Sequence, residues 1–81
     1  MRIRISETAL KQYKKLPTAL RQKADKQFEY LLTDIRHPSL HAKKYRESDD
    51  LWQARIDRDW RFYFFIVSPQ YIIVSVIKHP R

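Results

Sequence analysis

The chain has 81 residues, of which 17 are Lys or Arg and 9 are Asp or Glu, so its formal net charge is +8. This length supports one hydrophobic core, and we expect a single domain over residues 1–81. With 43% hydrophobic residues and no cysteine, a disordered chain, a disulfide framework and thiolate chemistry are excluded. The excess of positive charge favours a polyanionic partner, such as nucleic acid, an acidic protein or an anionic membrane.

The sequence does not predict a membrane location. The longest apolar stretch lies around residues 62–67, and a helix needs about 20 apolar residues to span a bilayer. The first residues, Met1-Arg2-Ile3-Arg4-Ile5, carry charge without the apolar core of a secretory signal. We therefore expect a cytoplasmic protein with no membrane partner.

The first half of the chain predicts a strand followed by two helices. Residues 2–5 alternate between Arg and Ile, as a strand with one buried face does. Ser6 suits the N-cap of a helix that ends at Leu16, and Pro17 suits the first turn of the next helix. That second helix should stop near Arg36, because the residue after it precedes a proline. Its apolar face consists of Leu20, Ala24, Phe28, Leu31 and Ile35.

The second half predicts three antiparallel strands after a polar stretch over residues 41–50. From Leu51 onward apolar and polar residues alternate, which is the period of a half-buried strand. Residues 57–59 and 68–70 have the composition of short turns, and short turns require antiparallel pairing. The expected fold is α+β, with an N-terminal strand, a helical hairpin and a three-stranded antiparallel meander against which the hairpin packs.

The same alternation assigns the two faces of the meander. The residues expected to face the helices are Trp52, Ala54, Ile56, Trp60, Phe62, Phe64, Ile66, Ile72, Val74 and Val76. The residues expected on the opposite face are Gln53, Arg55, Arg61, Tyr63, Tyr71, Ser75 and His79. Because the second set holds the basic and polar side chains, we expect the helix-free face to carry the function.

The order of these elements, together with several short motifs, resembles the RelE/ParE toxin superfamily. The motifs are His37-Pro38-Ser39-Leu40, Lys43-Lys44-Tyr45-Arg46, Leu51-Trp52-Gln53-Ala54-Arg55-Ile56, Trp60-Arg61-Phe62-Tyr63 and Val76-Ile77-Lys78-His79. Their order and spacing are more specific than any one of them. The resemblance implies the toxin of a type II toxin-antitoxin pair, a class whose RelE branch cleaves mRNA in the ribosomal A site and whose ParE branch poisons DNA gyrase.

In the RelE branch, basic residues on a concave face of the sheet act on RNA. By position, the resemblance implies catalytic roles for Arg55, Arg61, His79 and Arg81, and RNA-binding roles for Lys43, Lys44, Arg46, Gln53 and Tyr63. The implied reaction is an attack of the RNA 2′-hydroxyl on the adjacent phosphate, without a metal or another cofactor. Arginine suits the charge of the phosphorane, because its planar fork donates two hydrogen bonds and stays protonated. The implied partners are a cognate antitoxin protein and mRNA on the ribosome.

Two departures from the RelE pattern leave other functions open. Gln53 stands where many active relatives have lysine, and glutamine exchanges no proton at neutral pH. The chain ends at Arg81, without the tyrosine or basic residue that some members carry beyond the last strand, so Tyr63, Tyr71 or His79 would have to replace it. The alternative is a noncatalytic toxin-like protein, either a ParE-type gyrase inhibitor or a degenerate antitoxin-binding module. A free-standing RNA regulator ranks last, since no glycine-bearing RNA motif is present.

Each candidate residue also has an ordinary structural explanation. Strand arginines such as Arg55 and Arg61 can pair with Asp57 or Asp59 across the hairpin without any role in binding. Tyr63 can be a simple half-buried sheet residue, and lysines are common in polar loops. The 3 histidines of the chain lack a carboxylate or cysteine at ligand spacing, so no metal site is expected.

Overall fold

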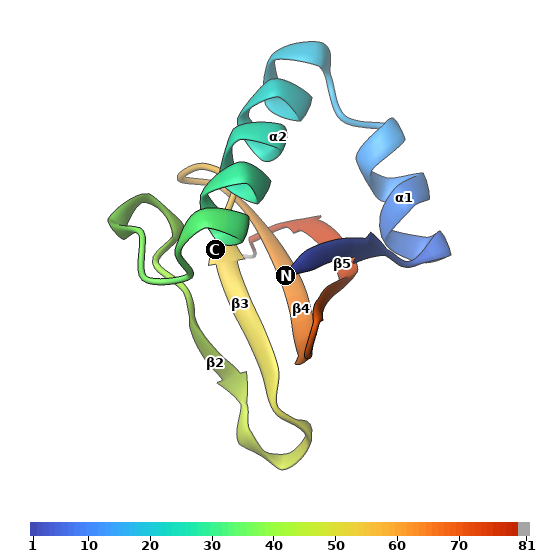
Figure 1. Ribbon diagram of the computed structural model, residues 1–81. Helices are drawn as coiled ribbons and strands as arrows, with labels where there is room; N and C mark the ends of the chain where they lie inside the picture. The colour runs from blue at the N-terminus through green and yellow to red at the C-terminus, as the bar shows by residue number, and fades with distance from the viewer. Residues whose placement is uncertain (80–81) are drawn as a thin grey trace.

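The computed structural model describes residues 1–79 and has two layers, one of α-helices and one of β-strands (Figure 1). The expected α+β class is confirmed. The elements in chain order are β1 (Arg2–Ile5), α1 (Glu7–Lys14), α2 (Thr18–Thr33), the 3₁₀ helix η1 (Pro38–Leu40), β2 (Lys43–Arg46), the 3₁₀ helix η2 (Glu47–Asp49), β3 (Leu51–Arg55), β4 (Trp60–Val67) and β5 (Gln70–Lys78). Within residues 1–79, no helix is long and apolar enough to cross a membrane.

The strands form one five-stranded sheet in the order β1-β5-β4-β3-β2. β1 runs parallel to β5, and the other neighbours are antiparallel. The expected meander of β3, β4 and β5 is present, but the prediction of a plain polar stretch over residues 41–50 is wrong, because Lys43–Arg46 pairs with β3 as a further strand. All four residues of this edge strand are exposed, so no alternation of apolar residues marks it.

Side chains of α1 fix its start and its position on the sheet. The Ser6 hydroxyl accepts a hydrogen bond from the Ala9 amide at 3.1 Å, which confirms the predicted N-cap. Farther along the helix, Gln12 Oε1 accepts a hydrogen bond from the Val76 amide of β5 at 2.7 Å. The helix is therefore bonded directly to the strand that it covers.

Both helices end before the positions predicted from sequence. The first was expected to reach Leu16 and the second to reach about Arg36, but α1 ends at Lys14 and α2 ends at Thr33. At the end of α2 the backbone of Asp34 is extended, and its carboxylate accepts a hydrogen bond from the amide two residues later. Such a local bond competes with helical hydrogen bonding and stops the helix early.

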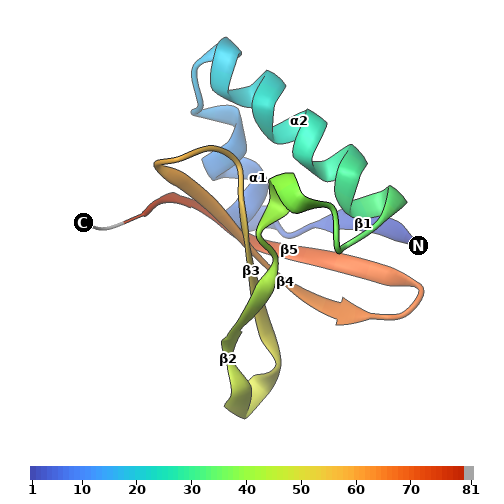
Figure 2. The same cartoon turned by 90° about the vertical axis from the view of Figure 1, so that its left-hand side faces the viewer.

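The core lies between the sheet and the two helices. Figure 2 shows α1 and α2 on the same side of the sheet, while the β2–β3 hairpin projects away from both helices. The buried core consists of Ala9, Leu16, Ala24, Phe28, Leu31, Leu40, Ala54, Ile56, Phe62, Phe64, Tyr71, Ile73 and Val76. The two helices leave the opposite face of the sheet uncovered, and the polar side chains of β3 to β5 lie there.

A β-bulge changes the face assignment in β5. The register between β4 and β5 shifts between Tyr63 and Phe64, which leaves Val74 as an extra residue in β5. An extra residue turns over the part of the strand before it, so Tyr71 is packed in the core. The prediction that Tyr71 lies on the helix-free face is therefore wrong. Three residues that were expected in the core lie outside it, namely Ile66, Ile72 and Val74.

Candidate functional site

The helix-free face of the sheet carries an open cleft of about 660 Å³. It is lined by His41, Ala42, Lys43, Lys44, Tyr45, Gln53, Arg55, Arg61 and His79. Among these lining residues four are Lys or Arg, and no acidic side chain belongs to the set. The cleft therefore has both the charge and the volume to hold an anionic ligand.

The pairing of the strands brings distant parts of the chain together in this cleft. Gln53 of β3 lies opposite Lys43 of β2 on one side and opposite Tyr63 of β4 on the other. Two residues farther along, Arg55 lies opposite Arg61. Directly opposed residues of antiparallel strands point to the same face of a sheet. The three strands therefore present one continuous set of basic and polar side chains.

Arg61 is the most buried cation of the cleft, with an exposed fraction of 6%. Its Nη1 donates hydrogen bonds to the carbonyl oxygens of Asp57 at 2.8 Å, of Trp60 at 3.0 Å and of Arg58 at 3.1 Å. Its Nε is also buried and has no hydrogen-bond partner among residues 1–79. The backbone holds this guanidinium in place without neutralising its charge, and Arg61 lines the cleft, so the group is positioned to bind an anionic ligand.

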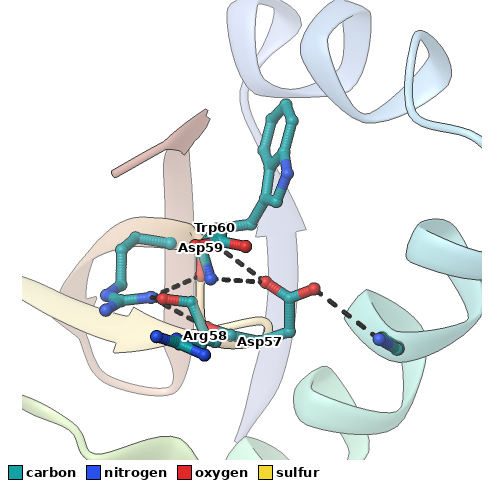
Figure 3. A network of polar contacts seen from close by, with 6 residues as sticks. Asp57, Arg58, Asp59 and Trp60 are labelled. Carbon is teal, nitrogen blue, oxygen red and sulfur yellow. Dashed lines mark hydrogen bonds and ion pairs between the residues drawn. The ribbon is translucent and has the colours of Figure 1, made fainter. Parts of the chain in front are cut away.

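The β3–β4 turn that holds Arg61 is fixed in turn by Asp57. One carboxylate oxygen of Asp57 accepts hydrogen bonds from the amides of Asp59 and Trp60, both at 2.9 Å (Figure 3). The other oxygen lies 3.7 Å from Nζ of Lys23 in α2. The turn predicted at this position is confirmed. Because it is bonded both within itself and to the helical layer, its carbonyl groups form a rigid support for the arginine.

Gln27 of α2 connects the two chain segments that border the cleft. It is 5% exposed, and its Nε2 donates hydrogen bonds to the carbonyl oxygens of Ser39 and Arg55, both at 2.9 Å. Its Oε1 accepts a hydrogen bond from the Ser39 hydroxyl at 2.7 Å. The side chain therefore links η1, which leads into β2, to the end of β3. Periodicity of apolar residues gives no sign of this role, because Gln27 is a polar residue on the buried side of the helix.

The cations of β2 are paired with acidic residues of the connection to β3. Nε and Nη2 of Arg46 donate to the two carboxylate oxygens of Asp49 at 2.8 and 2.6 Å. Nζ of Lys44 lies 2.9 Å from Asp50 and 3.7 Å from Glu47. Hydrogen bonding to these carboxylates raises the pKa of Lys44 and of Arg46, and it lowers the pKa of Asp49. These ion pairs cancel part of the positive charge at this end of the cleft.

A smaller and mainly apolar pocket of about 230 Å³ adjoins the cleft. It is lined by Tyr45, Leu51, Tyr63, Ser75, Ile77 and His79. Tyr63 is 6% exposed, and its ring meets the ring of Tyr45 edge-on, with 5.0 Å between the centroids and an angle of 72°. Burial raises the pKa of the Tyr63 phenol, so this group keeps its proton at neutral pH.

Two histidines line the cleft. His79 follows β5, its amide donates to the Asp59 carbonyl at 2.6 Å, and its buried Nδ1 has no hydrogen-bond partner within residues 1–79. His41 follows η1 with a φ of 46°, in the left-handed region that non-glycine residues seldom occupy. An imidazole can both accept and donate a proton, so both side chains are candidates for proton transfer. In the part of the chain that the structure describes, no group of three His, Asp or Glu side chains is placed to hold a metal ion.

The cleft brings together most of the site residues predicted from sequence. Those that line it are Lys43, Lys44, Gln53, Arg55, Arg61 and His79. Tyr63 lies in the adjoining pocket, and Arg46 is paired with an acidic residue near the tip of the β2–β3 hairpin instead of lining the cleft. Arg81 lies outside the described residues. Sequence reasoning missed His41 and Tyr45; recognition of β2 as a strand would have placed Tyr45 on the same face as the other site residues.

Solved structures with a similar fold are found among toxin-antitoxin proteins. A YoeB/ParE toxin from Agrobacterium tumefaciens matches with a TM-score of 0.82, covering 99% of this chain and 100% of the toxin at 10% sequence identity. A chain of the archaeal RelE-RelB complex from Pyrococcus horikoshii matches with a TM-score of 0.81, covering 99% and 96% at 19% identity. A chain of the E. coli RelBE toxin-antitoxin complex matches with a TM-score of 0.76, covering 98% and 96% at 22% identity. The chain has the RelE/ParE toxin fold.

This likeness confirms the fold that the sequence motifs implied. No protein-family model matches the sequence, and no curated protein matches it significantly. One fold can carry different activities, because function depends on the residues placed on the fold. The function of this RelE/ParE-fold protein therefore depends on the side chains of its cleft.

Proposed function

We propose that this chain is the toxin of a type II toxin-antitoxin pair and cleaves mRNA on the ribosome. The observation that carries the proposal is Arg61, a buried guanidinium that is bonded to the β3–β4 turn and has an Nε without a partner among residues 1–79. A buried guanidinium with one N–H that lacks an acceptor leaves part of its desolvation cost unrecovered. An RNA phosphate in the cleft supplies the negative charge that this guanidinium lacks.

The proposed reaction needs a group that stabilises charge on phosphorus. The RNA 2′-oxygen bonds to the adjacent phosphorus, the bond from phosphorus to the 5′-oxygen of the next nucleotide breaks, and a 2′,3′-cyclic phosphate and a 5′-hydroxyl result. Arg55 and Arg61 lie opposite each other and line the cleft, so both suit the extra negative charge of the phosphorane. Lys43 and Lys44 border the same cleft and suit the neighbouring phosphates.

The reaction also removes a proton from the 2′-hydroxyl and gives one to the leaving oxygen. The hydrogen bond to Asp50 raises the pKa of Lys44, and burial raises the pKa of Tyr63, so neither suits the role of base at neutral pH. We assign proton transfer to His41 and His79, which both line the cleft. One imidazole must accept the proton of the 2′-hydroxyl, and the other must donate a proton to the leaving oxygen.

An antitoxin protein belongs to the same proposal. The similar RelE-RelB and RelBE structures are toxin-antitoxin complexes. The formal charge of +8 suits an acidic partner, because complementary charge speeds and orients association. We expect such a partner to reduce the access of RNA to the cleft.

The alternative is a noncatalytic toxin-like protein, and Gln53 is the residue that favours it. Gln53 lines the cleft and is 7% exposed, so it occupies a central position on the helix-free face. Its amide can hold a phosphate oxygen but transfers no proton. A protein of this kind would inhibit DNA gyrase in the manner of ParE, or it would bind an antitoxin and have no other target.

Primer extension on an mRNA in programmed ribosomes tests the proposal, with the same RNA without ribosomes as a control. Arg55→Ala is the informative variant, because Arg55 lines the cleft whereas Arg61 also holds the β3–β4 turn. Arg36→Ala removes an exposed arginine outside the cleft and is the matched control. We expect cuts in the A-site codon with wild type and Arg36→Ala, and cuts about a hundredfold slower with Arg55→Ala.

The other results have defined meanings. If Arg55→Ala cleaved the mRNA as fast as wild type, the cleft would have no part in the cleavage reaction. If folded wild-type protein cut no mRNA on ribosomes, the nuclease proposal would be overturned, and a gyrase supercoiling assay on the same sample would separate the remaining possibilities. Inhibition of gyrase would identify a ParE-type protein, and no inhibition would leave the antitoxin-binding module.

A further inference from the structure

We propose that the apolar pocket beside the cleft binds one unpaired base of the RNA strand whose phosphate lies in the cleft. This inference rests on the proposed function and adds a second contact with the same substrate. We name this site, lined by Tyr45, Leu51, Tyr63, Ser75, Ile77 and His79, the base pocket.

The position of the base pocket is the first argument. Tyr45 and His79 line both the base pocket and the cleft, so the two cavities are continuous. The cleft is lined by cations, whereas the base pocket is mainly apolar. A nucleotide joins an anionic phosphate to a planar ring system over a short covalent distance. The pair of cavities therefore matches the two chemically different parts of one nucleotide.

The exposure and support of Tyr45 form the second argument. Tyr45 is 56% exposed although it is a large aromatic residue on an edge strand. Its ring is held edge-on by the ring of Tyr63, 5.0 Å away between centroids, and Tyr63 itself is 6% exposed. A ring that is supported from the protein side and open on the solvent side can stack on a base without losing much conformational entropy.

The size and the polar groups of the base pocket form the third argument. Its volume of about 230 Å³ is roughly a third of the 660 Å³ cleft, which suits one ring system better than a segment of polymer. Ser75 lies opposite Tyr63 on the helix-free face, and its hydroxyl both donates and accepts hydrogen bonds. His79 also lines the base pocket, and its imidazole can donate or accept a hydrogen bond. These groups suit the polar edge of a base.

A combined change of protein and RNA tests the base pocket on programmed ribosomes. The protein forms are wild type, Tyr45→Leu, which removes the ring, and Tyr45→Phe, which retains it. The RNA forms carry the natural A-site codon or an abasic ribose at one of its positions, so that every phosphate is kept. We expect Tyr45→Leu to slow cleavage of the natural codon about tenfold and Tyr45→Phe, which keeps the stacking ring, to recover most of that loss.

The combination of the two changes tests whether the Tyr45 ring and the RNA base contact each other. One abasic position should slow wild-type cleavage by a similar factor, and on that RNA Tyr45→Leu should cause no further loss, because the two changes remove the same contact. If wild type and Tyr45→Leu cleaved the natural codon at equal rates, or if the two losses multiplied at every codon position, the base-pocket proposal would be overturned. Cleavage in the A-site codon would still support the proposed nuclease function. Circular dichroism on each variant keeps a folding defect from being read as a binding defect.

A second measurement decides the question even if no cleavage occurs. Single-stranded RNA containing 2-aminopurine loses fluorescence when the modified base stacks on an aromatic ring. Quenching by wild type and Tyr45→Phe at low salt, and its loss with Tyr45→Leu, would support the base pocket independently of the nuclease activity. Equal quenching by all three proteins, or none by any of them, would count against it.

Discussion

The two ends of the cleft hold their cations in opposite ways. At the inner end, Arg61 is 6% exposed and is bonded to backbone carbonyl groups of the β3–β4 turn. At the outer end lies Lys44, and just beyond the cleft lies Arg46. Both belong to the exposed strand β2 and are bonded to acidic side chains of the same hairpin. In Figure 1 this hairpin extends away from the helical layer, so its tip has few contacts with the rest of the molecule.

The partners of the cations explain why the difference matters. Carbonyl dipoles position Arg61 without cancelling its charge, whereas carboxylates cancel the charge of the cations that they hold. The inner end therefore offers a fixed positive group to a ligand at all times. The outer end offers its cations fully only when their acidic partners move away or lose their charge. Arg61 and Arg46 have the same intrinsic chemistry, but Arg61 is more available to bind a phosphate because no carboxylate neutralises its charge.

The largest expected effect of this difference is on stability. Arg61→Ala should lower the free energy of unfolding by about 2–3 kcal/mol, because the turn loses a charged donor to several of its carbonyl groups. Arg46→Ala should leave the unfolding free energy almost unchanged, because its ion pair is solvent-exposed. Urea denaturation of both variants, followed by circular dichroism, measures the two free energies of unfolding. Equal losses at the two positions would contradict the distinction between the two ends.

A smaller effect is expected where the helical layer supports the cleft. Gln27→Leu should cost about 1–3 kcal/mol, because the carbonyl groups of Ser39 and Arg55 lose a buried donor. Gln22→Leu, at an exposed position of the same helix, is the matched control and should have little effect on the urea midpoint. The ribosomal cleavage assay should also show a loss for Gln27→Leu, since the position of Arg55 depends on it. A midpoint equal to that of wild type would mean that α2 does not fix the edge of the cleft.

Most of the fold can be predicted from the periodicity of apolar residues. The cap at Ser6, the two helices and the three strands of the meander all follow from it. Strand β2 does not, because it is exposed along its whole length and is held by its pairing with β3. The bulge at Val74 does not either, because one extra residue inside an apolar strand leaves the composition of that strand unchanged.

The candidate site was predicted less completely than the fold, for a different physical reason. Alternation and the family resemblance selected the face of the sheet that carries the cleft and most of the residues that line it. Residue type does not reveal that Arg61 is buried against carbonyl groups or that Arg46 is paired with Asp49. The addition of Tyr45 to the site depends on the register of β2, and that strand is held by backbone pairing. Each of these facts depends on a contact between groups rather than on a pattern of residue types.

Neutralising an acidic residue at the outer end should strengthen the binding of RNA modestly. Asp49→Asn releases Arg46, and Asp50→Asn removes the shorter of the two ion pairs of Lys44, so affinity for a short single-stranded RNA should rise by up to about fivefold. The dependence on salt should steepen by up to about 0.7 for each cation that gains a phosphate contact. Glu29→Gln makes the same charge change at an exposed position of α2 and is the control. Fluorescence anisotropy at several salt concentrations measures both quantities, and an equal gain from Glu29→Gln would point to net charge alone.

The smallest expected effect is the response of the outer end to pH. The hydrogen bond from Arg46 lowers the pKa of Asp49, so folding of the hairpin favours the charged carboxylate. Its contribution is fully present above the usual aspartate pKa of about 3.9 and is lost as the pH falls through the lowered value. Lys44 has the opposite sign, since its raised pKa keeps its contribution present below about pH 10.4 and loses it only as the pH rises through the raised value.

Both ion pairs should therefore persist across the neutral range, and salt or a competing phosphate, rather than a change of pH, should release the cations of the outer end. An NMR titration of the Asp49 carboxyl carbon in wild type and in Arg46→Gln measures the coupling directly. We expect the pKa of Asp49 to rise toward its usual value in the variant, because the hydrogen bond from Arg46 is the main cause of its lowering. An unchanged pKa would show that Arg46 is free of Asp49 in solution, and Arg46 would then be as available to RNA as the cations that line the cleft.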